Sequence, residues 1–286
     1  MKSEIRQDAQ FGRVLWLTDG KTEVGCALDF GLRIVQYCVA GMQNLLYRQS
    51  ADLSDGLTTE KGWKIWGGHR FWSAPESDLS YYPDNEAVSY ELLENGVILT
   101  QNVDPWLKEQ KSYRIEFLPN GDLSVEHILK NCADTAKKAA AWGVSTTAAG
   151  GYAVLPFPRT GKGDYNPKRV MSFWGNTTLC DERLQFTHDE IIASFKPSEN
   201  YLKLGIYSSV GHITRYNFNQ KFDISITPQP MENCADGGVN IELYMNKNVL
   251  EMETLGAFEE IAPNASVSHK EIWHVEKYLP QTETKQ

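Results

Sequence analysis

Residues 112–129, SYRIEFLPNGDLSVEHIL, decide the fold class, because two alternating runs flank one turn signal. Apolar side chains occupy every second position from 113 to 117, and Leu123, Val125, His127 and Leu129 share one face of the second run. This period of two is typical of a strand with one buried face. The dipeptide Asn120-Gly121 between the runs predicts that they form a β-hairpin.

The same pattern extends outward along most of the chain. Residues 90–93 and 97–100 flank Asn95-Gly96 and predict a second hairpin. Further runs that are typical of strands lie at 14–17, 25–29, 34–39, 191–195, 202–207, 222–226, 239–244 and 268–275. Helical periodicity is nearly absent, and glycine and proline are spread evenly without a linker. We therefore expect one all-β domain over residues 1–286, an antiparallel sandwich with residues 280–286 as a solvated tail.

Composition narrows the classes of partner. The 286 residues carry a net charge of -9, and Lys and Arg are scattered, which disfavours nucleic acid and anionic membranes as partners. Residues 1–19 lack the apolar core of a signal peptide, and no run reaches about 18 apolar residues, so we expect a cytoplasmic protein. The five cysteines form no C-x-x-C pair, which favours free thiols and no metal site.

An acidic pair lies in the segment 243–256, LYMNKNVLEMETLG. Glu251 and Glu253 are two residues apart, so in a strand they share one face about 6 to 7 Å apart, with Leu250 and Met252 on the other face. Two carboxylates placed opposite a core are a candidate proton-transfer site. The alternative is an exposed strand edge with two solvated glutamates.

The strand before this pair has a polar face that includes Glu242, Tyr244 and Asn246. The chain also contains 8 Trp and 13 Tyr, more than packing alone normally requires. Carboxylates, amides and aromatic rings are the groups that hold hydroxyl-rich ligands. This composition favours a sugar as the ligand, with Tyr244 among its contacts.

A second cluster spans residues 63–76, WKIWGGHRFWSAPE. Its paired glycines could let the backbone approach a ligand and deliver His69 and Arg70 together, with Trp66 and Glu76 nearby. His69 could donate a proton near neutral pH, and Arg70 could bind a carboxylate, a phosphate or a pair of hydroxyls. The alternative is structural: Arg70 pairs with Glu76 or another acid, and His69 caps a turn. The metal-binding motif H-E-x-x-H is absent from this segment.

The other histidines favour structural roles. His127 lies in register with the apolar face of residues 123–129, which favours a hydrogen-bonded core histidine over a catalytic one. Surface roles are expected for His188, His212, His269 and His274.

Three segments carry a resemblance to a known family. Residues 243–255, with Tyr244, Asn248 and LEMETL, resemble the C-terminal segment of galactose mutarotase-like proteins (aldose 1-epimerases). Residues 29–34, DFGLRI, followed by Gly41 and NLLY at 44–47, resemble the opening strands of that fold. Between them, WGGHRFW at 66–72, APE at 74–76, Trp142, Gly150-Gly151 and Pro156 resemble a poorly characterised bacterial branch of the superfamily.

The resemblance implies a large antiparallel β-supersandwich with a sugar-binding cleft and no cofactor. It implies that Glu251 is the base that takes the proton from the anomeric hydroxyl while an acid protonates the ring oxygen. Glu253 would help by like-charge repulsion, which eases protonation of one of the pair. The substrate-binding residues expected from both lines of reasoning are Arg70, Glu253, Tyr244, Trp66, Glu76 and Trp142.

One departure from the family leaves the reaction open. Where epimerases usually carry a catalytic histidine, residues 141–148 read AWGVSTTA. Either His69 supplies the acid, or the protein keeps the cleft as a non-catalytic carbohydrate-binding or regulatory domain. A glycoside hydrolase or lyase would require a third acid such as Glu76, because Glu251 and Glu253 project in parallel and cannot straddle a bond. Arg70 would also suit an anionic sugar such as a uronate or a phosphate.

Overall fold

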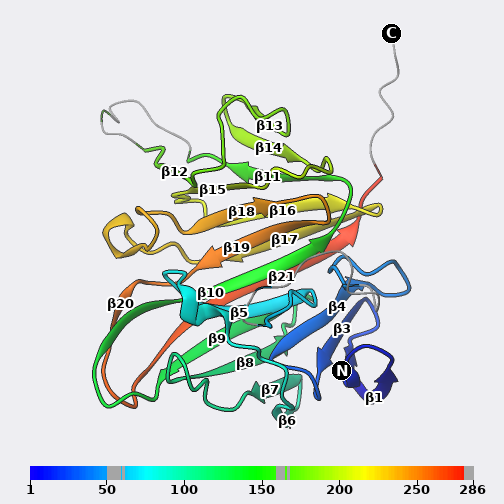
Figure 1. Ribbon diagram of the computed structural model, residues 1–286. Coiled ribbons are helices and arrows are strands. Elements are labelled where there is room, and N and C mark those ends of the chain that lie inside the picture. The colour runs from blue at the N-terminus through cyan, green and yellow to red at the C-terminus, as the bar shows by residue number, and fades with distance from the viewer. Residues whose placement is uncertain (50–58, 60–61, 159–164, 166–167, 280–286) are drawn as a thin grey trace.

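Two antiparallel sheets make up the protein (Figure 1). The computed structural model describes residues 1–49, 59, 62–158, 165 and 168–279, so the predicted tail at 280–286 lies outside the described residues. An eleven-stranded sheet has the order β1-β2-β3-β4-β5-β10-β19-β18-β15-β12, with β20 paired to β10. A ten-stranded sheet has the order β13-β14-β11-β16-β17-β21-β9-β8-β7-β6. The predicted all-β class is confirmed.

The strands of the eleven-stranded sheet are β1 (Lys2–Asp8), β2 (Gly12–Thr18), β3 (Thr22–Ala27), β4 (Arg33–Val39), β5 (Gly68–Ala74), β10 (Lys137–Ala148), β12 (Met171–Phe173), β15 (Leu202–Ile206), β18 (Ile241–Met245), β19 (Val249–Leu255) and β20 (Glu259–Ile261). Those of the ten-stranded sheet are β6 (Ser89–Leu93), β7 (Gly96–Thr100), β8 (Glu109–Phe117), β9 (Leu123–Asn131), β11 (Tyr152–Pro156), β13 (Leu184–Phe186), β14 (Glu190–Ser194), β16 (His212–Asn217), β17 (Gln220–Ile226) and β21 (Ser266–Lys277). Two short 3-10 helices are η2 (Asp78–Tyr81) and η3 (Met231–Asn233).

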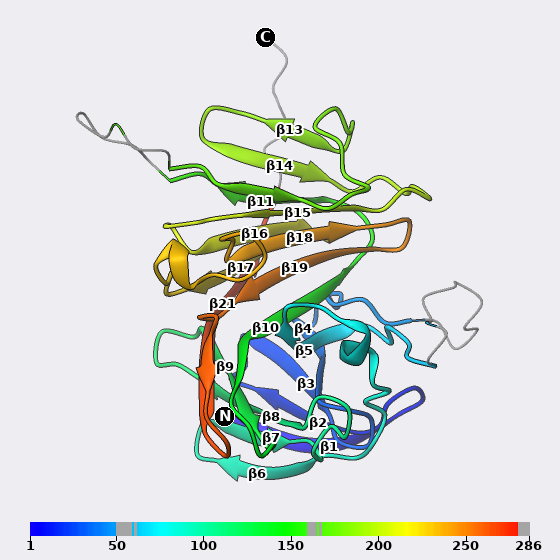
Figure 2. The same cartoon turned by 60° about the vertical axis from the view of Figure 1, so that its left-hand side comes forward.

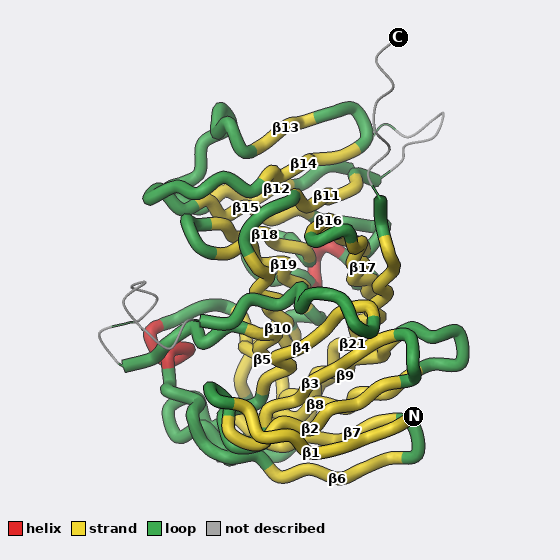
Figure 3. Tube along the Cα trace, turned by 90° about the vertical axis from the view of Figure 1, so that its right-hand side faces the viewer, coloured by secondary structure: helices red, strands yellow, loops and turns green. Residues whose placement is uncertain are grey.

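The edges of the two sheets lie at opposite ends of the molecule. β1 and β6 lie at one end, and β13 and β14 lie at the other (Figures 2 and 3). β10, β19 and β21 cross the middle of the molecule between these ends (Figure 1). No helix in the described part of the chain is long and apolar enough to span a membrane.

The core lies between the sheets. It is formed by the apolar residues that alternate with polar ones along the strands. Tyr113 and Ile115 of β8 point into it from one sheet, and Leu250 and Met252 of β19 from the other. Each such side chain stabilises the fold by roughly 1.5 to 3 kcal/mol through removal from water. This packing fixes the register of β19 and turns its alternate residues, Glu251 and Glu253, to the outer face.

Both predicted hairpins are confirmed: β6 pairs with β7, and β8 pairs with β9. The sequence did not indicate β5 and β10, although these strands pair with each other in the centre of the larger sheet. β5 is buried along its whole length and β10 along nearly all of it. A strand that is covered on both faces needs no apolar and polar alternation, so the pattern that reveals the hairpins is missing here.

Candidate functional site

The candidate site lies on the outer face of five neighbouring strands, β5, β10, β19, β18 and β15. Their register aligns the site in rows. One row contains Thr146, Glu251, Tyr244 and Lys203 on successive strands. The next row contains Arg70, Val144, Glu253 and Glu242. Strand pairing thus brings together residues that are up to 183 positions apart, since Glu253 and Arg70 differ by that number.

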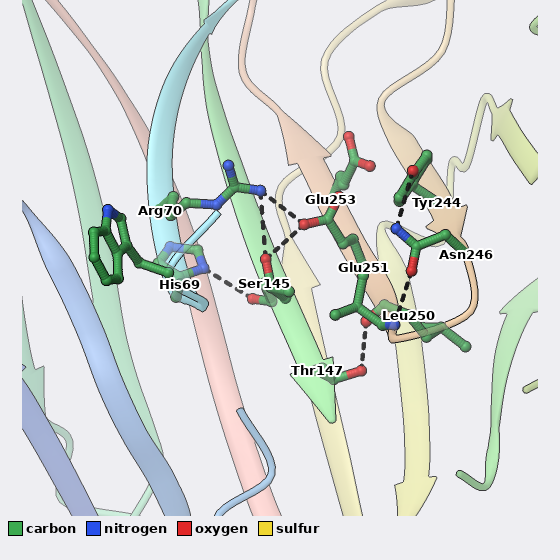
Figure 4. Close-up of polar contacts among 12 residues, drawn as sticks. His69, Arg70, Ser145, Thr147, Tyr244, Asn246, Leu250, Glu251 and Glu253 are labelled. Atoms are coloured by element: carbon green, nitrogen blue, oxygen red, sulfur yellow. Dashed lines mark hydrogen bonds and ion pairs between the residues drawn. The ribbon is translucent and has the colours of Figure 1, made fainter. Parts of the chain in front are cut away.

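Glu251 is held at one of its two carboxylate oxygens. Arg70 Nη2 donates to Glu251 Oε1 at 2.7 Å, and Thr146 Oγ1 donates to the same oxygen at 2.6 Å (Figure 4). Arg70 and Glu251 are both buried, and such charge-assisted bonds are the strong ones. Glu251 Oε2 accepts no hydrogen bond from any described residue. It is therefore available to a ligand.

Lys203 lies among carboxylates on the other side of the cleft. Its Nζ is 3.2 Å from Glu253 Oε2 and 3.1 Å from Glu242 Oε2, and Trp142 Nε1 donates to Glu253 Oε2 at 3.0 Å. Burial opposes the charge of Lys203, but the two carboxylates outweigh it and raise the pKa of Lys203. Burial also raises the pKa of Glu253 and, well above its usual value, that of Glu242, while Lys203 opposes both shifts.

Aromatic rings form much of the cleft wall. The Arg70 guanidinium lies 5.0 Å from the ring centres of Trp63 and Trp72. Lys203 Nζ lies 4.4 Å from Trp142 and 4.9 Å from Trp174. These cation–π contacts add to the ion pairs and fix both cations in place.

The cleft has a volume of about 420 Å³, within the usual range of small-molecule sites. The residues that line it are Thr59, Trp63, Ile65, Arg70, Trp72, Glu76, Tyr81, Trp142, Val144, Trp174, Tyr201, Lys203, Tyr244, Asn246, Glu251 and Glu253. Six of the eight residues that the sequence singled out lie together here: Glu251, Glu253, Arg70, Tyr244, Glu76 and Trp142.

His69 does not line the cleft, contrary to the expectation that it would share the site of Glu251. It is adjacent to Arg70 in β5, and successive strand residues point to opposite faces, so His69 points between the sheets (Figure 4). Its Nδ1 lies 2.8 Å from Ser145 Oγ and its Nε2 lies 2.7 Å from His127 Nε2. Burial, followed by the neighbouring histidine, lowers the pKa of His69 well below its usual value.

Trp66 also lies outside the cleft. It packs edge-on against Phe30, with ring centres 4.6 Å apart, in a small cluster that includes Phe11 and Val35. Trp66 has φ 49°, and Gly67 and Gly68 follow with φ 92° and 79°, so the chain turns sharply between Trp66 and β5. Trp63 lines the cleft in its place.

The remaining histidines divide into buried and exposed ones. The predicted core position of His127 is confirmed, with Nδ1 3.1 Å from the His269 carbonyl oxygen. The surface role expected for His269 is wrong, because its side chain is buried against Thr254 Oγ1 at 2.6 Å. His69, His127 and Glu271 place potential ligand atoms within 4.8 Å of one another. The Nε2–Nε2 distance of 2.7 Å fits a hydrogen bond better than two ligands of one tetrahedral zinc, which lie about 3.3 Å apart.

Sequence reasoning did not single out several residues of the cleft, among them Lys203 and the rings of Trp63, Trp72, Tyr81, Trp174 and Tyr201. It also missed Thr146, which binds Glu251. One feature of the sequence pointed to Lys203: it is the single charged residue in the run 202–207, LKLGIY, which is predicted as a strand. A charge within such a run needs a partner when the strand is buried. The partners, Glu242 and Glu253, could not be inferred without the sheet order.

No protein-family model matches the chain, and no curated protein matches it. Similar solved structures include a galactose mutarotase related enzyme from Lactobacillus acidophilus, with 9% identity, TM-score 0.54, and 94% of this chain and 99% of that chain covered. A galactose mutarotase-like protein from Clostridium acetobutylicum has 11% identity and TM-score 0.53, with 96% and 98% covered.

A TPR-domain containing protein from Parabacteroides distasonis has 13% identity and TM-score 0.59. The match covers 96% of this chain but only 50% of the Parabacteroides protein, so the chain spans about half the length of that protein. At these identities the likeness shows the fold alone. The chain therefore has a galactose mutarotase-like β-sandwich fold, which confirms the fold that the resemblance implied.

Proposed function

We propose that the protein binds a small sugar in the cleft and interconverts its anomers, as an aldose 1-epimerase does, with Glu251 as the base. The observation that carries this proposal is the state of the Glu251 carboxylate: Oε1 is fixed by Arg70 and Thr146, and Oε2 has no partner among the described residues. A base that is fixed at one oxygen and open at the other can take a proton in a defined direction.

The acid in this proposal is Tyr244, which lies directly opposite Glu251 in the β18–β19 register. Its hydroxyl accepts a hydrogen bond from Asn246 Nδ2 at 3.2 Å, so its own proton is available to the ring oxygen of a sugar. Burial raises the pKa of Tyr244 to about 12, which keeps this proton in place at neutral pH. Glu251 removes the proton of the anomeric hydroxyl, the ring opens, the aldehyde rotates, and ring closure in reverse gives the other anomer.

The remaining predictions about the site belong to the same proposal. Glu253 anchors Trp142 and Lys203 in the cleft wall, and its negative charge also favours protonation of Glu251. The WGGHRFW segment at 66–72 supports membership of the bacterial branch of the superfamily that it resembles. The five free cysteines support a cytoplasmic setting.

A second candidate function is sugar binding without catalysis. The Arg70–Glu251 ion pair favours it, because a carboxylate fixed by a guanidinium can accept hydrogen bonds from sugar hydroxyls without taking a proton. No histidine of the described chain lines the cleft to replace the one that epimerases usually carry.

NMR measurement of anomeric exchange separates the two functions. The wild type and Glu251→Gln are compared at equal concentration on a set of aldoses, with Glu91→Gln on β6 as the control for an exposed acid outside the cleft. Catalysis predicts faster exchange in the wild type and the control, and loss of that acceleration in Glu251→Gln. Sugar-induced chemical shifts without any acceleration would reject the isomerase and leave the binding protein.

A further inference from the structure

Both cations that line the cleft are already paired. Arg70 binds Glu251 at 2.7 Å and lies against Trp63 and Trp72. Lys203 lies between Glu242 and Glu253 at 3.1 and 3.2 Å. An anionic ligand would have to compete with these buried carboxylates for either cation. Arg70 Nε and Nη1 have no hydrogen-bond partner among the described residues, but both atoms are buried.

The charge balance of the cleft is negative. Three carboxylates line it, those of Glu76, Glu251 and Glu253, against the two cations Arg70 and Lys203. A fourth carboxyl group, Glu242, lies behind Lys203, and burial favours its neutral form because its pKa is raised well above the usual value. Arg70 pairs with Glu251 and Lys203 pairs with Glu253, so Glu76 is the lining carboxylate that has no cation of the described residues within ion-pair distance.

Glu76 is at the mouth of the cleft, beyond the end of β5. The Tyr81 hydroxyl donates to its Oε1, and no cation of the described chain lies within ion-pair distance. Tyr81 and the rings of Trp63 and Trp72 meet edge to face, with centres 5.3 to 5.5 Å apart. Trp63 and Trp72 already contact Arg70, so the exposed Glu76 carboxylate and the adjacent Tyr81 ring are the groups that favour an added ammonium group.

We propose that the cleft prefers a sugar with a protonated amino group over a uronate or a sugar phosphate, and that Glu76 receives the ammonium group. This inference rests on the proposed function in one respect, that the ligand is a sugar. An ammonium group cancels the unbalanced charge at Glu76, whereas a carboxylate or phosphate adds to it. Because Glu76 is exposed, its effect is one of preference, about tenfold in affinity.

Calorimetric titration at pH 6.5 tests the preference with glucosamine, N-acetylglucosamine, glucose and glucuronate. We expect glucosamine to bind about tenfold more tightly than the two neutral sugars, and glucuronate to bind most weakly. In Glu76→Gln, which keeps an acceptor for Tyr81, glucosamine should fall to the level of glucose, while neutral sugars stay within about twofold. Glu91→Gln should behave as the wild type.

Two sugar-free probes, cyclohexylammonium and cyclohexanecarboxylate, separate this inference from the proposed function. Tighter binding of glucuronate, or a glucosamine preference that survives in Glu76→Gln, overturns the inference and leaves sugar binding intact. Binding of cyclohexylammonium that depends on Glu76, with no binding of any sugar, overturns the proposed function and leaves the charge preference standing. No binding of any sugar or probe overturns both.

Discussion

Two polar clusters lie on opposite faces of the same strands, β5 and β10. The cleft cluster, Arg70, Thr146 and Glu251, joins opposite charges on the outer face. The histidine cluster, defined as His69, Ser145, His127, His269, Thr254, Glu271 and Trp273, lies between the sheets. Among the described residues, only His69 lies within ion-pair distance of Glu271, at 3.9 Å, and its lowered pKa keeps it neutral.

The comparison shows how the surroundings of each cluster affect the charge of its titratable groups. In the cleft cluster, the guanidinium and the carboxylate stabilise each other's charges. In the histidine cluster, burial lowers the pKa of His269 to about 4 and raises that of Glu271 to about 7. Buried groups without a countercharge favour their neutral forms. Burial between the sheets therefore keeps His69 neutral, whereas Arg70, whose guanidinium is always charged, lies on the outer face beside the Glu251 carboxylate.

The largest expected effect comes from breaking the ion pair of the cleft cluster. Arg70→Met leaves the buried Glu251 carboxylate without its cation, and we expect a loss of about 3 kcal/mol in the free energy of unfolding, measured by urea denaturation at pH 7. The double variant Arg70→Met/Glu251→Gln removes both charges and should recover much of the loss. A loss below about 1 kcal/mol in Arg70→Met would show that water already solvates Glu251.

A smaller effect is expected in the histidine cluster. There a substitution should raise, rather than lower, the free energy of unfolding at alkaline pH. The folded pKa of Glu271 is raised to about 7 from 4.5, so the stability that it contributes is fully present below pH 4.5 and is lost as the pH rises to 7. Glu271→Gln resembles the protonated acid, because its amide can donate to Thr254 while its oxygen accepts from Trp273. The free energy of unfolding of this variant, relative to that of the wild type, should therefore rise by about 2 kcal/mol from pH 5.5 to pH 8.5.

Urea denaturation of both proteins at the two pH values measures this gain. Glu126→Gln, at a partly exposed position of β9, is the control and should show the same pH dependence as the wild type. A constant difference between Glu271→Gln and the wild type across the range would mean that Glu271 stays ionised when buried.

The sequence predicted the parts of the fold that have one solvated face. β8 and β9 could be recognised because polar residues alternate with the core residues, and the Asn-Gly turn fixed their pairing. β5 and β10 could not be recognised, because both of their faces are covered and polar residues do not alternate regularly with apolar ones.

The candidate site follows the same division. Glu251, Glu253 and Tyr244 were predicted together because they are close in the chain and share a strand face. Assignment of His69 to the cleft failed because no strand was predicted at residues 68–74, so the opposite directions of His69 and Arg70 were not foreseen. Lys203 depends on β15 pairing with β18, a long-range pairing that local patterns do not reveal.

The smallest expected effects compare Ser145 and Thr146, neighbours in β10 that belong to different clusters. Ser145→Ala removes the partner of His69 Nδ1 and should cost about 1 kcal/mol of stability, with sugar affinity and anomeric exchange unchanged. Thr146→Val removes a hydrogen bond to Glu251 Oε1, so exchange should slow several-fold, because the base is held less firmly. Urea denaturation and NMR exchange on both variants check this. Slower exchange in Ser145→Ala would contradict the independence of the two clusters, because it would show that the histidine cluster acts on the cleft through β10.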